Sequence, residues 1–269
     1  MGAEPGLLDL RGLACRFGGL LAVDQVDLTL ERGDLAGLIG PNGAGKTTCF
    51  NLIAGKIRPT GGSVSFLGRN LAGLKPHAVN KLGIARTFQN IRLFDELTAL
   101  ENVLVGCHGR LDANFLSAIF RLPGYVAEER RMRLLAEGLL ELMGLDRLAQ
   151  ERAGNLAYGQ QRLLEIARAL ATQPTLLLLD EPAAGMNPQE TGELAKLVRR
   201  LRDERRITVL LIEHDMHFVM NLCEHLTVLD QGRVIARGDP PTVQNDPAVI
   251  EAYLGAELPG EGEGGAAHA

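Results

Sequence analysis

One stretch of the sequence carries residues suited to binding phosphate groups. Residues 40–48 read GPNGAGKTT, which fits a glycine, four variable residues and then Gly-Lys-Thr. An apolar run of strand type precedes it, and residues 47–54 have the composition of a helix. Backbone N–H groups at such a turn surround an anion, Lys46 adds a positive charge, and the Thr47 hydroxyl suits Mg²⁺. We predict a nucleoside triphosphate site formed by Gly40, Pro41, Asn42, Gly43, Ala44, Gly45, Lys46, Thr47 and Thr48.

A pair of carboxylates follows a second apolar run. Residues 176–179 are four leucines, and Asp180 and Glu181 come directly after them. Such a run is typical of a strand buried on both faces of a parallel sheet, and ligands bind at the carboxyl edge of these sheets. We predict that Asp180 positions Mg²⁺, mostly through water, and that Glu181 orients or deprotonates an attacking water. The alternative is that the pair only caps the following segment.

Composition restricts the class of protein. The chain has 269 residues, enough for one large α/β domain or two small ones, and a formal net charge of −5 argues against a broad nucleic-acid-binding face. Its four cysteines are far apart and form no metal-binding spacing, so we expect them to be reduced and buried. No apolar run approaches the roughly 18 to 20 residues that span a bilayer, and no secretory signal is visible. Action at a membrane would therefore need a partner.

The elements expected around these residues alternate between strands and helices. Strands are predicted at 7–15, 26–30, 35–39, 63–67, 83–88, 176–180 and 207–212, and helices at 47–54, 76–81, 161–171 and 187–205. Strand signals fade between residues 100 and 155, where a helix is predicted over 125–142. We predict one domain, residues 1–255, with a core of about 1–95 and 155–255, a helical subdomain of about 96–154, and a disordered tail over 256–269.

The order of the motifs resembles that of the ATP-binding subunits of ABC transporters. The phosphate loop is followed by Gln89, the helical region, the segment LAYGQ (residues 156–160), Asp180–Glu181 and His214. LAYGQ is the most specific element, because it resembles the family signature Leu-Ser-Gly-Gly-Gln. The resemblance covers about residues 7–255. It implies an α/β fold with a RecA-like P-loop NTPase core, an antiparallel β subdomain and a helical insertion.

The family resemblance assigns roles that spacing alone does not. From the residues alone, Phe17 is more readily a core or turn aromatic, and Gln89 a surface residue. The resemblance implies that Phe17 stacks on adenine, Gln89 senses the γ-phosphate and Mg²⁺, Glu181 is the general base, and His214 contacts the γ-phosphate. The implied catalytic residues are Lys46, Gln89, Glu181 and His214, and the implied metal-binding residues are Thr47, Gln89 and Asp180.

The signature segment is expected to complete a site on another subunit. In the family it faces the ATP bound by the opposite subunit, so that two subunits enclose two nucleotides. The residues concerned are Leu156, Ala157, Tyr158, Gly159 and Gln160. Ala157 and Tyr158 stand where Ser and Gly are usual, and Asn187 stands where Asp is common. We expect hydrolysis to be retained, since Lys46, Asp180, Glu181 and His214 are in place.

A narrower resemblance concerns the cargo. The phrases RFGGL (16–20), NLAYG (155–159), DEPAAG (180–185), IEHDM (212–216) and AYLG (252–255) resemble the LivG-type subunits of branched-chain amino-acid importers. The resemblance implies ATP and Mg²⁺ as cofactors. It implies as partners two transmembrane permease subunits, a second homologous ATPase subunit or a second copy, and indirectly a substrate-binding protein, at the cytoplasmic face of the inner membrane. Residues 90–97 and the helical insertion would dock the permeases. Another cargo, such as urea or lipopolysaccharide, and a soluble ABC ATPase remain alternatives.

Overall fold

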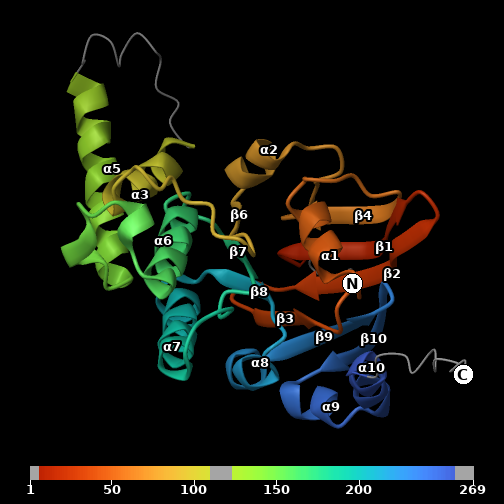
Figure 1. Ribbon diagram of the computed structural model, residues 1–269. Helices are drawn as coiled ribbons and strands as arrows, with labels where there is room; N and C mark the ends of the chain where they lie inside the picture. Colours follow the sequence, from red (N-terminus) through yellow and green to blue (C-terminus); the bar gives the residue numbers. More distant parts are fainter. Residues whose placement is uncertain (1–5, 110–122, 258–269) are drawn as a thin grey trace, which may run out of the picture.

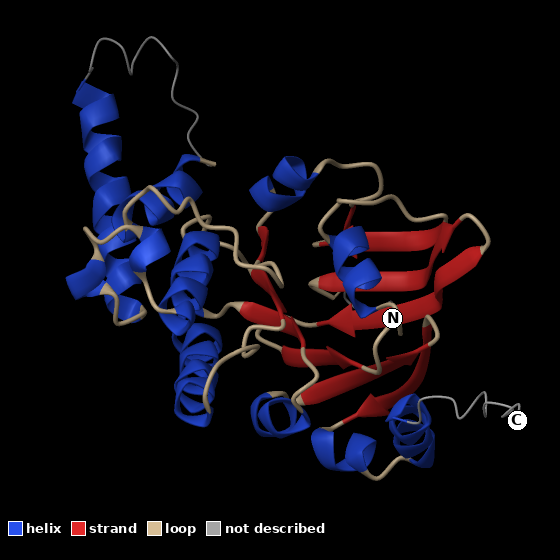
Figure 2. Ribbon diagram, in the orientation of Figure 1, coloured by secondary structure: helices blue, strands red, loops and turns tan. Residues whose placement is uncertain are grey.

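Two β-sheets and the helices around them make up the fold. The computed structural model describes residues 6–109 and 123–257 (Figure 1, Figure 2). None of the helices in these ranges combines the length and the apolar character that a bilayer crossing requires. Strands and helices both occur in the first and last thirds of the chain, and the described residues between β6 and β7 contain helices and no named strand, in agreement with the prediction that strand signals fade there.

The larger sheet has six strands in the order β10-β9-β3-β8-β7-β6. Neighbouring strands are parallel except at the edge, where β10 runs antiparallel to β9. The strands are β3 (Leu35–Ile39), β6 (Ile84–Arg86), β7 (Leu176–Asp180), β8 (Thr208–Ile212), β9 (His225–Asp230) and β10 (Arg233–Gly238). Because β3 lies next to β8, and β8 next to β7, the phosphate loop and the Asp180–Glu181 pair leave the same edge of the sheet.

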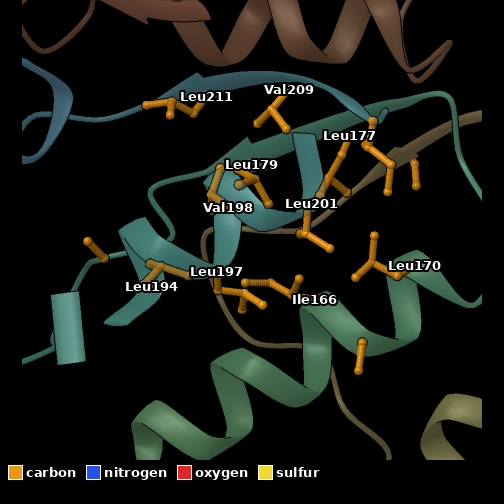
Figure 3. Packing of buried hydrophobic residues seen from close by; sticks show 14 of the residues in the cluster. Ile166, Leu170, Leu177, Leu179, Leu194, Leu197, Val198, Leu201, Val209 and Leu211 are labelled. Carbon is orange, nitrogen blue, oxygen red and sulfur yellow. The ribbon is translucent and has the colours of Figure 1, made fainter. Parts of the chain in front are cut away.

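The four leucines of β7 are divided between two layers of core. Leu177 and Leu179 pack with residues of α6 (Tyr158–Leu170) and α7 (Pro188–Arg205) on one face (Figure 3). Leu176 and Leu178 belong to the cluster on the other face, which includes Phe50 of α1 (Lys46–Ile53). All four are fully buried. Burial on both faces explains why this strand shows no polar alternation.

The smaller sheet is antiparallel, with the strand order β2-β1-β4-β5. It consists of β1 (Leu8–Phe17), β2 (Leu20–Leu30), β4 (Gly61–Phe66) and β5 (Arg69–Asn70). β1 and β2 form a hairpin that is longer than predicted, so Phe17 and Leu20 pair at its closed end. The inner face of this sheet shares its core cluster with β3, β7 and β8.

The remaining helices lie around the sheets. Figure 1 places α3 and α5 at the end of the molecule away from the antiparallel sheet. The elements are α2 (Pro76–Lys81), α3 (Ala99–His108), α5 (Pro123–Leu142), the short η1 (Asp146–Leu148) and η2 (Ala153–Asn155), α8 (Met216–Leu222), α9 (Pro240–Gln244) and α10 (Pro247–Glu257). α10 includes the first two residues of the predicted tail; residues 258–269 lie outside the described part of the chain, as do residues 110–122.

The cysteines behave as small buried hydrophobes. Cys15, Cys49, Cys107 and Cys223 are all free and buried. Burial raises the pKa of the Cys49 and Cys223 thiols to about 12, so neither forms a thiolate near neutral pH. The prediction of reduced, buried cysteines is confirmed.

Candidate nucleotide-binding site

The phosphate loop is held by close backbone contacts that only glycine permits. A Cβ on Gly40 would lie 2.0 Å from the Leu229 carbonyl oxygen of β9, and one on Gly45 would lie 2.4 Å from the Ala22 carbonyl oxygen of β2. Both glycines also have positive φ angles, 143° and 102°. The loop is therefore clamped between the two sheets. No side chain caps the N-terminus of α1, so the first N–H groups of this helix are available to an anion.

Lys46 is folded into the loop that it follows. Its side chain is largely buried, and Nζ donates hydrogen bonds to the carbonyl oxygens of Gly40 at 2.6 Å and Pro41 at 2.9 Å. Burial lowers the pKa of Lys46, while the nearby carboxylates of Glu181 and Asp180 act in the opposite direction. The structure thus places a positive charge between the loop and the carboxylates, where the outer phosphates of a nucleotide carry negative charge.

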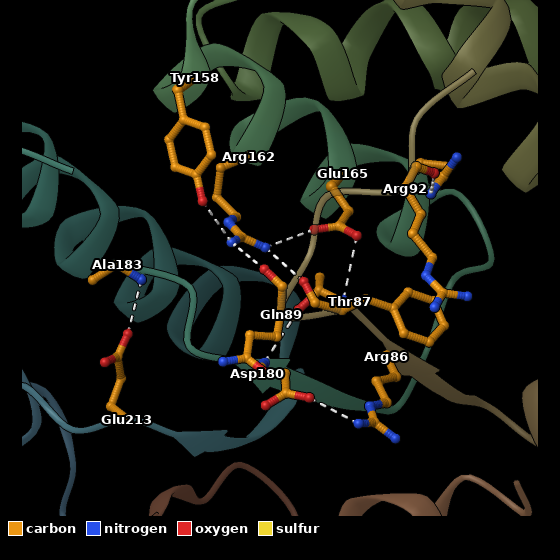
Figure 4. A network of polar contacts seen from close by, with 12 residues as sticks. Arg86, Thr87, Gln89, Arg92, Tyr158, Arg162, Glu165, Asp180, Ala183 and Glu213 are labelled. Carbon is orange, nitrogen blue, oxygen red and sulfur yellow. Dashed lines mark hydrogen bonds and ion pairs between the residues drawn. The ribbon is translucent and has the colours of Figure 1, made fainter. Parts of the chain in front are cut away.

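Asp180 presents one free oxygen at the end of β7. Its side chain is almost fully buried, and Oδ2 accepts a hydrogen bond from Arg86 Nη2 at 2.8 Å (Figure 4). Oδ1 is also buried but has no hydrogen-bond partner among the described residues. A buried carboxylate oxygen without a partner is costly, and a hard cation is the ligand that it suits. Asp180 and the Thr47 hydroxyl therefore fit Mg²⁺. Sequence reasoning did not find Arg86, which holds the other oxygen.

Glu181 adopts a backbone conformation that is uncommon for its residue type. Its φ is 48°, and its N–H donates to the Ile212 carbonyl of β8 at 2.9 Å. Strain of this kind is found at functional sites. The Glu181 Oε2 atom accepts a hydrogen bond from Gln89 Nε2 at 3.0 Å and lies 3.8 Å from His214 Nδ1. The structure therefore brings together Gln89, Glu181 and His214, which are far apart in the sequence.

A buried arginine that the sequence did not single out holds Gln89 in place. Arg162 of α6 is fully buried and donates to the carbonyl oxygens of Phe88 at 2.7 Å and Gln89 at 2.8 Å (Figure 4). Its Nη1 also contacts Glu165 Oε2 at 2.9 Å, and Glu165 Oε1 accepts from the Phe88 N–H at 3.3 Å. Burial raises the pKa of the Glu165 carboxyl group, and the positive charge of Arg162 acts against this rise. The only sequence signal is a pair of opposite charges three residues apart on an otherwise apolar helix face.

Glu213, a carboxylate that the sequence did not single out, holds the backbone just after β8. Glu213 is fully buried and accepts hydrogen bonds from the backbone N–H groups of Ala183 at 2.8 Å and His214 at 3.1 Å. Burial raises its pKa, and these hydrogen bonds act against the rise. Glu213 thereby joins the segment after Glu181 to the segment that carries His214. His214 itself is mostly exposed, with its ring near Glu181.

The structure places Phe17 on the surface and Asn187 at the start of α7. Phe17 is 50% exposed at the closed end of the β1–β2 hairpin, so a core role is wrong and a turn or base-stacking role stays open. The Asn187 side chain caps α7, since Oδ1 accepts from the N–H groups of Gln189 and Glu190, both at 3.0 Å. An amide oxygen serves that purpose as well as a carboxylate.

The signature segment differs from expectation in one respect. α6 begins at Tyr158 and not near residue 161, so Gly159 lies in the first turn of the helix, where backbone N–H groups have no intrahelical partner. Gly159 is buried, and a Cβ there would lie 2.9 Å from Glu190 Oε1 of α7. Gly159 therefore lies directly against the Glu190 carboxyl group. The free N–H groups of α6 begin after Ala157, whose own N–H is held by Gln160 Oε1 at 3.0 Å, while Leu156 is buried in the core.

Comparison with known proteins identifies the family of this chain. A family model described as ABC transporter matches residues 23–184, and one described as branched-chain amino acid ATP-binding cassette transporter matches residues 233–258. The chain is 49% identical over 249 residues to the high-affinity branched-chain amino acid transport ATP-binding protein BraF of Pseudomonas aeruginosa, covering 93% of this chain and 98% of that protein. It is 47% identical to LivG of Escherichia coli K12, with the same coverage.

Solved structures agree with the family models. The crystal structure of the ADP conformation of an ATP-binding cassette of an ABC transporter matches with a TM-score of 0.81 and 35% identity, covering 93% of this chain and 98% of that one. A dimeric, post-hydrolysis cassette bound to ADP and phosphate matches with a TM-score of 0.73 and 27% identity, covering 87% and 98%. The phosphate loop, the paired carboxylates and the signature helix thus lie in a fold that these cassettes share. The chain belongs to the ABC transporter family, as one of its ATP-binding, ATP-hydrolysing subunits.

Proposed function

We propose that this chain is the motor subunit of an importer for leucine, isoleucine and valine. Hydrolysis is supported above all by one observation, the Glu181 carboxylate held by Gln89 at 3.0 Å beside the phosphate loop and Asp180. The cargo is supported by the relatives, whose printed names assign them to branched-chain amino acid transport and whose similarity extends over nearly their whole length. The family model that matches residues 233–258, near the C-terminus, is described as a branched-chain amino acid ATP-binding cassette transporter, and it supports the same cargo.

The described residues divide the work of hydrolysis among them. Lys46 and the free N–H groups at the start of α1 would bind the phosphates, and Thr47, Gln89 and Asp180 would hold Mg²⁺, which would supply positive charge to neutralise the phosphate oxygens. Glu181 accepts a proton from the attacking water. His214, beside Glu181, orients the terminal phosphate. Phe17 stacks on the adenine from the hairpin end.

Each ATP is shared between two cassettes in this proposal. The exposed residues Ala157 and Tyr158 and the uncapped N-terminus of α6 form a second phosphate-binding surface, remote in sequence from the loop. The dimeric state of the related cassette bound to ADP and phosphate supports such an arrangement. The partner cassette is either a homologous subunit or a second copy of this chain. Closing and opening of the pair would convert hydrolysis into a rigid-body motion.

The transmembrane subunits would bind beside Gln89, at the cytoplasmic face of the membrane. A cavity of about 450 Å³ opens there between α1, α2 and the segment after β6. Its lining combines the apolar Val79, Ile84 and Phe88 with exposed basic side chains of Lys56 and Arg92. Arg92 lies over the Phe88 ring at 4.9 Å. An amphipathic segment with acidic residues would fit this surface, and Arg92 lies within the residues, 90–97, predicted to dock it.

Reversing one charge in this cavity should separate docking from nucleotide binding. We expect Arg92→Glu to lower co-purification with the transmembrane subunits by about tenfold or more, because like charges across an interface cost several kcal/mol. ATP affinity of the variant, measured by calorimetry, should stay within about twofold of the parent. Arg69→Glu, on the exposed edge strand β5, is the matched control and should retain both properties. Full co-purification of Arg92→Glu would contradict docking at this cavity.

The cargo is tested by reconstitution. The chain, its two transmembrane subunits, the second cassette and the substrate-binding protein would be placed in liposomes, and ATP hydrolysis measured with different solutes. We expect leucine, isoleucine and valine each to raise the rate several-fold over the solute-free rate, because the loaded binding protein favours the closed cassette dimer. Urea and charged amino acids should leave the rate unchanged. Stimulation by one of these solutes alone would contradict the proposed cargo.

A further inference from the structure

Tyr158 connects the signature segment to the catalytic segment of the same subunit. Its hydroxyl accepts a hydrogen bond from Arg162 Nη2 at 3.2 Å, and the same Nη2 donates to the Gln89 carbonyl at 2.8 Å (Figure 4). One nitrogen thus joins the first residue of α6 to the residue whose side chain holds Glu181. The Tyr158 side chain itself remains 46% exposed, on the surface that the proposed function assigns to the opposite ATP.

The Tyr158 ring makes a second connection, to the segment that follows Glu181. A Cβ on Gly185 would lie 2.9 Å from Cε1 of the tyrosine ring, so the ring lies directly against that glycine. Gly185 has a φ of 77° and lies between the Glu213-bound Ala183 and the start of α7. Tyr158 is therefore linked to both segments that flank Glu181 in space, to Gln89 through its hydroxyl and Arg162, and to Gly185 through its ring.

The hydrogen bond to Tyr158 matters because Arg162 has few alternatives. Its guanidinium is fully excluded from water, and Nε has no partner among the described residues. The other two nitrogens are held by the carbonyls of Phe88 and Gln89, by Glu165 and by the Tyr158 hydroxyl. Loss of one acceptor leaves an N–H of this buried charged group unsatisfied, which lowers the stability of the packed arrangement relative to a locally opened one in which water reaches the guanidinium.

We propose that Tyr158 is a positioning residue that couples the two ATP sites of a cassette dimer within one subunit. This proposal rests on the proposed function, which places the signature segment against the ATP bound by the opposite subunit. When that contact moves the start of α6, Tyr158 and Arg162 transmit the displacement to the Gln89 backbone, and the Gln89 side chain changes its position on Glu181. The tyrosine, which stands where glycine is usual in the family signature, thus supplies a link that glycine lacks.

Hydrogen exchange of the nucleotide-free chain tests the link without relying on activity. Tyr158→Phe removes only the hydroxyl and keeps the ring against Gly185. We expect amide exchange of residues 86–92 to accelerate about three- to fivefold, because the Phe88 N–H is held through Glu165 and Arg162. Tyr253→Phe removes the same atom from α10 and should leave residues 86–92 unchanged. Equal exchange in Tyr158→Phe and the parent chain would overturn the proposal.

A double-mutant cycle with Gln89→Ala tests the functional consequence in the assembled transporter. Tyr158→Phe should lower kcat about fivefold, and should have little further effect once the Gln89 side chain is absent. Equal effects in both backgrounds would overturn the proposed coupling through Gln89. If Gln89→Ala alone leaves kcat unchanged, the proposed catalytic role of Gln89 fails, and the exchange result still decides the link. Arg162→Lys, which keeps a charge for Glu165 but cannot reach all four acceptors, should reproduce the faster exchange.

Discussion

Replacing Glu181 with glutamine is expected to lower ATP turnover by about 10²- to 10⁴-fold, the range that a positioned general base contributes. The change is isosteric, so the 3.0 Å contact with Gln89 and the φ of 48° are retained while the basic oxygen is lost. Turnover is measured as phosphate release by the assembled transporter, and ATP affinity by calorimetry on the isolated chain. Affinity should be unchanged or higher, since the carboxylate's negative charge near the phosphates is removed.

The control for this substitution is Glu193→Gln, which makes the same chemical change on the exposed face of α7. We expect its turnover to equal that of the parent chain. A dimer of Glu181→Gln chains should also persist in ATP, because the nucleotide that holds the two cassettes together is no longer consumed; size-exclusion chromatography measures this. Parental turnover in Glu181→Gln would refute the role of this carboxylate as the base.

Replacing Lys46 with alanine is expected to weaken ATP binding by about 10- to 100-fold, the effect of one or two charge-assisted hydrogen bonds. The loss should decrease from ATP to ADP and vanish for adenosine, because the phosphate oxygens are the only part of the nucleotide that the ammonium group is proposed to contact. Calorimetry with the three ligands measures the series. Affinities reduced equally for all three would indicate collapse of the loop and contradict a specific role for the charge.

Folding must be checked separately for this substitution. Lys46 Nζ donates to two carbonyl oxygens of the loop, and alanine leaves both without that donor. We therefore expect the free energy of unfolding to fall by about 1 to 3 kcal/mol as well, measured by urea denaturation. Lys46→Arg keeps the charge in a larger group and should bind ATP more weakly than the parent chain without the adenosine affinity changing.

Local sequence patterns were sufficient for most of the fold. The run of leucines before Asp180 predicted a strand buried on both faces, and β7 is that strand, with alternate residues in the two core clusters. The helix predicted over 76–81 is present as α2. The prediction was possible because proline at the first position of a helix favours a helix start. The phosphate loop was equally readable, since its glycines, lysine and threonine act through neighbouring backbone groups.

Contacts between distant segments were not readable in the same way. Arg86, Arg162 and Glu213 are ordinary charged residues in the sequence, and each acquires its role by being buried against a segment far along the chain. Gly159 is a further example, because the glycine expected to face the opposite ATP also lies against the Glu190 carboxyl group of α7. Packing of α6 against α7 decides that, and no local pattern records it.

The sequence by itself predicted which groups perform the chemistry: the phosphate loop, Asp180, Glu181, and, through the resemblance in their order along the chain, Gln89 and His214. Only the tertiary structure decided how these groups are held. One Asp180 oxygen accepts a hydrogen bond from Arg86, and the other has no partner among the described residues. The Gln89 carbonyl accepts a hydrogen bond from a buried arginine that also contacts Tyr158. The physical reason is that the type of a side chain is local information, whereas its burial and hydrogen-bond partners depend on strands and helices that meet only in the folded chain.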